Sequence, residues 1–101
     1  MEHDLVAEKD LAPGQMLAVK AGDKNIILCR GTDNVIYALE DRCSHADVKL
    51  SAGSFDGKEV RCTAHGARFD VCNGKPLCMP AVAPVNSYPV KMVNGRVIVV
   101  I

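Results

Sequence analysis

The sequence predicts an all-β protein made of short antiparallel strands. Three observations support this fold class: short runs rich in Val, Ile and Leu recur along the chain, turn-forming residues separate them, and two of the separators are dipeptides typical of hairpins. No window of a dozen residues carries a clean apolar repeat of about 3.6 residues, so no long amphipathic helix is expected. The chain has 101 residues, of which 49% are hydrophobic, and we expect a single domain over residues 1–101 with one modest core.

The first half of the sequence predicts a β-meander. Turn-forming separators rich in Gly, Asp, Asn and Pro divide it into short apolar runs. The expected strands are residues 5–8, 16–20, 25–29 and 35–40, and the separators are Pro13-Gly14, residues 21–23 and residues 31–34.

Two hairpins are expected in the second half. Asp-Gly and Asn-Gly dipeptides favour the positive φ angles that two-residue hairpin turns require. The hairpins are residues 54–55 and 59–61 around Asp56-Gly57, and residues 90–93 and 96–99 around Asn94-Gly95. The second of these is the strongest local signal in the sequence.

Two longer stretches do not fit the strand pattern. They are residues 41–52 and residues 72–86, the second of which contains Pro76, Pro80 and Pro84. Loops of this length are uncommon in compact domains and are often functional. We therefore expect the functional chemistry to lie at these stretches.

Charge and composition exclude several classes of partner. Twelve basic and twelve acidic residues cancel, so no net charge attracts the protein to nucleic acid or to an anionic membrane. Four aromatic residues and no Trp leave little to build a stacking surface for single-stranded nucleic acid. The chain begins without an apolar leader, and its longest apolar run, residues 97–101, is too short to span a membrane. A cytoplasmic location is expected, with no nucleic-acid or membrane partner.

The cysteine pattern argues against a disulfide framework, because five is an odd number and no secretory signal is present. Cys29 lies within an apolar run, so we expect it to pack in the core as a small hydrophobic side chain. Cys72 and Cys78 are expected to be free thiols, and the sequence assigns them no role. His3 is expected to be a solvated side chain at an unanchored terminus.

The remaining two cysteines each lie close to a histidine. The segments are Cys43-Ser44-His45 and Cys62-Thr63-Ala64-His65, separated by the sixteen residues 46–61. The hairpin expected between them can bring the segments side by side, so that two thiolates and two imidazoles converge. This set matches the four terminal ligands of a [2Fe-2S] cluster with two histidines on one iron. Two Cys and two His also satisfy tetrahedral zinc, although zinc motifs usually pair like ligands on one element, whereas each segment here is mixed.

This ligand order resembles that of the Rieske family, in which Cys-x-His is followed by a spacer of similar length and then by Cys-x-x-His. The resemblance continues through residues 66–70 and 73–75 and covers nearly the whole chain. It implies a Rieske fold of short antiparallel sheets, with a cluster-binding part at about residues 41–86. That part would consist of two ligand loops and a covering loop that contains proline, at residues 76–84.

The resemblance also implies how one [2Fe-2S] cluster of the Rieske type is held. Cys43 and Cys62 would bind the buried iron, and His45 and His65 would bind the outer iron, with their rings near the surface. We therefore expect the cofactor-binding and metal-binding residues to be these four, and no residue to be catalytic.

Two departures from the high-potential members of the family predict a low reduction potential. Those members carry an extra cysteine in each ligand loop, where this chain has Val48 and Ala64. They also carry a Ser and a Tyr that donate hydrogen bonds to sulfur, where this chain has Ala67 and Phe69. Hydrogen bonds to sulfur favour the extra electron, so the potential is expected toward the low end of a range of about −150 to +300 mV.

The sequence is more similar to the ferredoxins of bacterial multicomponent aromatic-ring dioxygenases than to the membrane-anchored proteins of cytochrome bc complexes. That similarity implies a soluble, monomeric carrier that takes single electrons from a flavin-dependent reductase and delivers them to a terminal Rieske oxygenase. A chain of 101 residues has no room for the oxygenase's own catalytic domain. An electron-transfer component is therefore expected, not an enzyme.

Other functions stay open at this point. The small subunit of an assimilatory nitrite reductase resembles this fold but often lacks cluster ligands, all four of which are present here. A zinc-stabilised interaction module would use the same four residues without a redox role. No residue distinguishes a ferredoxin that serves a monooxygenase, and the substrate of the terminal oxygenase leaves no mark on a carrier.

Overall fold

The computed structural model describes residues 1–43, 48–63, 66–77 and 83–101. In these ranges the extended elements are β-strands, and the helical elements are two single turns of 3-10 helix, η1 (Glu8–Asp10) and η2 (Leu50–Ala52). The predicted all-β class is confirmed. No helix in the described part of the chain is long and apolar enough to cross a membrane.

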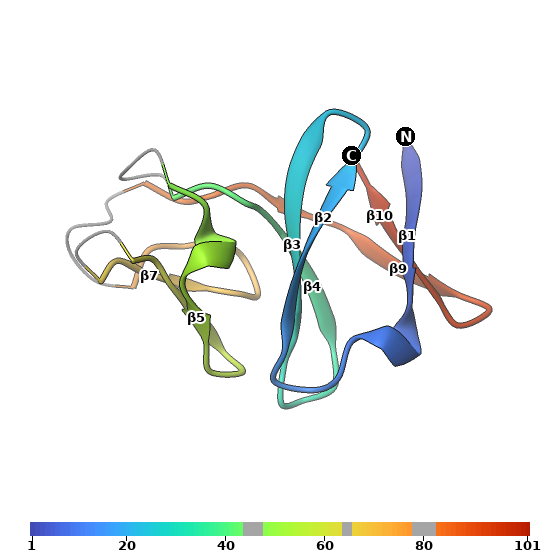
Figure 1. Cartoon of the computed structure of the whole chain (residues 1–101), viewed down its shortest axis with the longest axis horizontal. Helices are drawn as coiled ribbons and strands as arrows, with labels where there is room; N and C mark the ends of the chain where they lie inside the picture. Colours follow the sequence, from blue (N-terminus) through green and yellow to red (C-terminus); the bar gives the residue numbers. More distant parts are fainter. Residues whose placement is uncertain (44–47, 64–65, 78–82) are drawn as a thin grey trace.

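The strands form three antiparallel sheets, and the third lies to one side of the other two (Figure 1). The first has the order β1-β10-β9, the second β2-β3-β4-β8 and the third β5-β6-β7. Their bounds are β1 Glu2–Ala7, β2 Met16–Ala21, β3 Lys24–Arg30, β4 Ile36–Glu40, β5 Ser54–Phe55, β6 Glu59–Arg61, β7 Arg68–Asp70, β8 Ser87–Tyr88, β9 Val90–Val93 and β10 Arg96–Val100.

The predicted meander is present only as β2 to β4, because the first predicted strand, β1, pairs with β10 in another sheet. β1 begins at Glu2, three residues earlier than expected, because its first residues pair with β10 from the far end of the chain. His3 is therefore opposite Val99 and is half-buried, so the prediction of a solvated side chain at an unanchored terminus is wrong. Glu8, expected in the strand, begins η1 instead.

Both predicted hairpins are present. In the β9–β10 hairpin, Asn94 (φ 50°) and Gly95 (φ 76°) both adopt the positive φ of a type I′ turn. In the β5–β6 hairpin the Asp56 N–H donates to the Glu59 carbonyl, so the two turn residues are Gly57 and Lys58, one position later than expected. The Asp56 carboxylate accepts the N–H groups of Lys58 and Glu59, which fixes this turn.

The core is divided into two clusters by β3. This strand is buried on both faces, and its side chains alternate between the two sides because successive residues of a strand point in opposite directions. Ile26 and Leu28 pack against side chains of the first sheet, whereas Ile27 and Cys29 face the third sheet. Each fully buried aliphatic side chain contributes about 1.5–3 kcal/mol to folding. β3 therefore supports the third sheet and the loops attached to it.

Candidate metal centre

The structure brings Cys43 and Cys62 together in one buried cluster. Cys43 follows β4 after two residues, and Cys62 follows β6 directly. Each is 1% exposed, and both belong to the core cluster that contains Leu39, Val60 and Phe69. Two thiols from segments far apart in the sequence thus reach the same apolar interior.

A backbone hydrogen bond closes each predicted ligand loop at its base. The Cys43 N–H donates to the Val48 carbonyl at 2.9 Å, and the Cys62 N–H donates to the Ala67 carbonyl at 2.7 Å. Each hydrogen bond therefore joins the two ends of a loop that begins at the cysteine. His45 and His65 fall between these closure points in the sequence and lie outside the described residues.

The described donors fit half of a Rieske ligand set. Buried thiols without a disulfide can be deprotonated by a metal and bind it as thiolates, and Cys43 and Cys62 are both buried and in no disulfide. No group of three or more His, Cys, Asp or Glu among the described residues could hold a metal, so any complete site needs ligands from the loop residues beyond them. The two cysteines would supply the soft ligands of one iron.

The first ligand loop is held against the third sheet by a close backbone approach. Gly53 ends η2, and a Cβ atom built on it would lie 1.8 Å from the Arg61 carbonyl oxygen. Arg61 is the residue immediately before Cys62. The lack of a side chain at Gly53 therefore lets the end of the first loop touch the strand that leads into the second.

The base of the predicted covering loop is also fixed. Gly74 adopts φ +76° and accepts the Val85 N–H at 2.9 Å, and the Leu77 N–H donates to the Arg68 carbonyl at 2.9 Å. Pro76 forms an isolated bridge with Phe69 on β7. Cys78 and Pro80, which the sequence analysis assigned to this loop, lie outside the described residues.

Two of the positions used to predict a low potential, Ala67 and Phe69, lie in the same buried cluster as Cys62. Ala67 and Phe69 are both fully buried in the core cluster that holds the two cysteines, and Val48 packs against that cluster. None of these side chains can donate a hydrogen bond to sulfur. Ala64 lies outside the described residues.

The other described cysteines match their predicted states. Cys29 is fully buried in the core, and Cys72 is an exposed free thiol. Burial, with a smaller contribution from the negative charge of Asp41, raises the pKa of the Cys29 thiol from 9.0 to about 12. Cys29 is thus a protonated packing residue at neutral pH.

Replacing Cys29 with Ala is expected to cost about 1–2 kcal/mol of folding free energy and to leave iron content and spectra unchanged. The raised pKa adds a pH dependence: unfolded chains lose the thiol proton near pH 9 and the folded protein retains it to about pH 12, so wild-type stability falls across that window. Thermal unfolding at neutral pH and between pH 9 and about 12 should show that the variant loses less stability with rising pH than the wild type. Loss of iron in the variant would contradict the packing role.

Comparison with known proteins shows the family of the chain. Residues 2–89 match the model of the Rieske [2Fe-2S] domain. The chain belongs to the Rieske family. It is 38% identical to the ferredoxin component of the naphthalene 1,2-dioxygenase system of Pseudomonas putida, over 95% of this chain and 91% of the relative. It is 40% identical to the ferredoxin component of biphenyl 2,3-dioxygenase of Rhodococcus jostii, over 89% of this chain and 83% of the relative.

Solved Rieske structures share the whole fold. The ferredoxin of carbazole 1,9a-dioxygenase from Nocardioides aromaticivorans matches with a TM-score of 0.91 and 30% identity, over 97% of this chain and 95% of that chain. A complex of reduced oxygenase and oxidized ferredoxin in carbazole 1,9a-dioxygenase matches with a TM-score of 0.90 and 33% identity, over 97% and 91%. This Rieske protein therefore carries one [2Fe-2S] cluster and is an electron carrier, not a catalytic enzyme.

Sequence reasoning missed the residues that support the ligand loops. Asp41 and Ser51 are joined by hydrogen bonds across the first loop, and Gly53 and Gly74 permit close backbone contacts. No short motif identifies these pairs, because each contact joins positions eight or more residues apart. The only local signal was the unusual length of the two stretches that contain Asp41, Ser51 and Gly74.

Proposed function

We propose that this Rieske ferredoxin carries single electrons from a flavin-dependent reductase to the terminal oxygenase of an aromatic-ring-hydroxylating dioxygenase system. The observation that carries the proposal is the buried pair Cys43 and Cys62, each at the base of a closed loop, in a chain that aligns over nearly its full length with ferredoxin components. Residues 1–101 act as one domain, with the cluster-binding part at about residues 41–86.

Four residues hold the cluster in this proposal. Cys43 and Cys62 bind the iron that lies in the apolar core, and His45 and His65 bind the outer iron. When bound, the cluster accepts and releases one electron at a time. The chain's own residues exclude water around the two cysteines and hold their backbone N–H groups in hydrogen bonds with Val48 and Ala67.

The partners follow from the relatives. A ferredoxin of the same fold has been solved in complex with its oxygenase, which supports docking of this chain to a terminal oxygenase. The reductase is inferred from the naming of the relatives as components of dioxygenase systems. A monomer in the cytoplasm suits a carrier that must dock with two partners in turn through a small interface.

Electron paramagnetic resonance of the dithionite-reduced protein, together with iron and zinc analysis, tests the cluster. We expect a rhombic Rieske signal and about two irons per chain. A zinc-loaded protein without the signal would support the interaction-module alternative, once faulty cluster loading during expression has been excluded.

Reconstitution tests the pathway. The ferredoxin, mixed with a flavin-dependent reductase, reduced nicotinamide cofactor and a terminal ring-hydroxylating oxygenase, should support turnover that stops when the ferredoxin is omitted. Copurification with a large siroheme-bearing chain, and no turnover with oxygenases, would favour the nitrite reductase subunit instead.

A further inference from the structure

Asp41 carries a carboxylate that is buried under the first ligand loop. It is 4% exposed. Among the described residues, the buried charged side chains are those of Asp41 and Arg30. The Asp41 Oδ1 accepts the Ser51 N–H at 2.8 Å and its Oδ2 accepts the Ser51 hydroxyl at 2.7 Å. Hydrogen bonds to both oxygens stabilise the charged form of a carboxylate.

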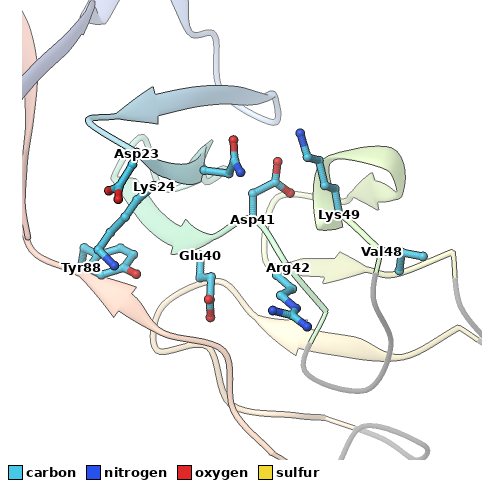
Figure 2. A pocket seen from close by; sticks show the side chains of 9 residues that line it. Asp23, Lys24, Glu40, Asp41, Arg42, Val48, Lys49 and Tyr88 are labelled. Atoms are coloured by element: carbon cyan, nitrogen blue, oxygen red, sulfur yellow. The ribbon is translucent and has the colours of Figure 1, made fainter.

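Neutral groups donate these hydrogen bonds, so they do not cancel the charge. The ion pairs between described residues do not include Asp41. Asp41, Arg42 and Lys49 line one hollow of about 470 Å³ (Figure 2). Arg42 and Lys49 are exposed. Water screens an exposed charge much more strongly than a buried one.

The backbone of Asp41 is fixed two residues before Cys43. Its N–H donates to the Asn25 carbonyl on β3 at 3.0 Å, and Cys43 follows two residues later. Its charge also acts on the pKa of Cys29, after the larger effect of burial. Cys29 belongs to the same core cluster as Cys43 and Cys62, so the charge of Asp41 acts on a side chain of the cluster that holds the two cysteines.

We propose that Asp41 sets the reduction potential: its buried negative charge disfavours the extra electron on the cluster and so lowers the potential of this ferredoxin. The proposal rests on the proposed function, because it needs a cluster on Cys43 and Cys62. It adds an electrostatic cause to the missing hydroxyl donors at Ala67 and Phe69. An added electron is repelled by a nearby negative charge, and the apolar core screens that repulsion weakly.

The test is the potential of the Asp41→Asn variant in the cluster-loaded protein. Asn keeps the shape of Asp, its oxygen can still accept the Ser51 N–H, and its amide can donate to the Ser51 hydroxyl oxygen. At a fixed applied potential we expect the ratio of reduced to oxidised protein to rise about tenfold, equivalent to about 59 mV for one electron, with an unchanged Rieske spectrum.

Two matched variants separate charge from structure. Asp23→Asn removes an exposed carboxylate that lines the same hollow and should leave the potential unchanged. Ser51→Ala removes the hydroxyl donor but keeps the Asp41 charge, so it should lower thermal stability without raising the potential.

An unchanged potential in Asp41→Asn with an intact spectrum would overturn the proposal and leave the proposed function standing. If Asp41→Asn does not load a cluster, Asp41→Ser provides a smaller neutral side chain for the same measurement. Loss of the cluster in both variants would also overturn it, since Asp41 would then be a structural residue only. Absence of a Rieske signal in the wild type would instead refute the proposed function.

Discussion

Replacing Cys62 with Ala is expected to abolish cluster binding, and Cys43→Ala is expected to do the same. Both thiols are buried, so no water can replace the lost ligand without opening the core. An alanine methyl group offers no ligand atom, and the iron would keep at most one of its two thiolates. Iron content should fall to background, and the visible absorption and the paramagnetic signal of the reduced protein should disappear.

Cys29→Ala and Cys72→Ala are the matched controls for this prediction. Cys29 lies in the same core cluster as the two proposed ligands, and Cys72 is exposed. Both controls should retain about two irons per chain. If Cys62→Ala kept its iron and its signal, the ligand assignment would be wrong, and the Rieske cluster would need a different set of donors.

The fold was predictable where the signal was local. Asn94-Gly95 predicted its hairpin because both residues tolerate positive φ, and the apolar run around Ile27 predicted a strand. β7 and β8 were missed, because each has only two or three residues and gains its strand conformation from pairing with β6 or β4. Short edge strands of this kind are specified by the tertiary fold more than by their own residue preferences.

The candidate site was predictable in its ligands but not in its supports. The spacing of Cys43 and Cys62 relative to two histidines has a chemical meaning that survives in the sequence alone. The hydrogen bonds from Ser51 to Asp41 join residues ten apart around a loop whose path the sequence does not reveal. Such contacts depend on the course of the backbone, and an Asp or a Ser in a loop is far more often solvated.

The anchored N-terminus illustrates the same limit. Nothing in the first residues indicated that they would pair with the last strand, 94 or more residues away in the sequence. The Ile101 N–H donates to the Met1 carbonyl at 2.9 Å, so the two ends of the chain are joined. This non-local pairing places β1 beside β10 and half-buries His3.

Gly53→Ala is the second substitution for which we expect a large effect. The new methyl group would lie 1.8 Å from the Arg61 carbonyl oxygen, and this backbone atom cannot rotate away as a flexible side chain could. The end of the first ligand loop must then move away from β6, next to Cys62. We expect a loss of about 3 kcal/mol, at the upper end of typical overpacking costs, and a lower unfolding temperature by about 15 °C.

The loss should extend to the cluster, because the displaced segment joins the two loops that carry Cys43 and Cys62. Iron content after identical expression and thermal unfolding of the loaded protein measure both effects. Gly14→Ala is the control: Gly14 adopts φ +83° in a turn with no atom within 4 Å of its Cβ position, so it tests backbone strain without a steric contact. That variant should lose about 1–2 kcal/mol and keep its iron. If Gly53→Ala were as stable and as fully loaded as wild type, the contact between the first loop and β6 could not be what holds the two ligand loops in register.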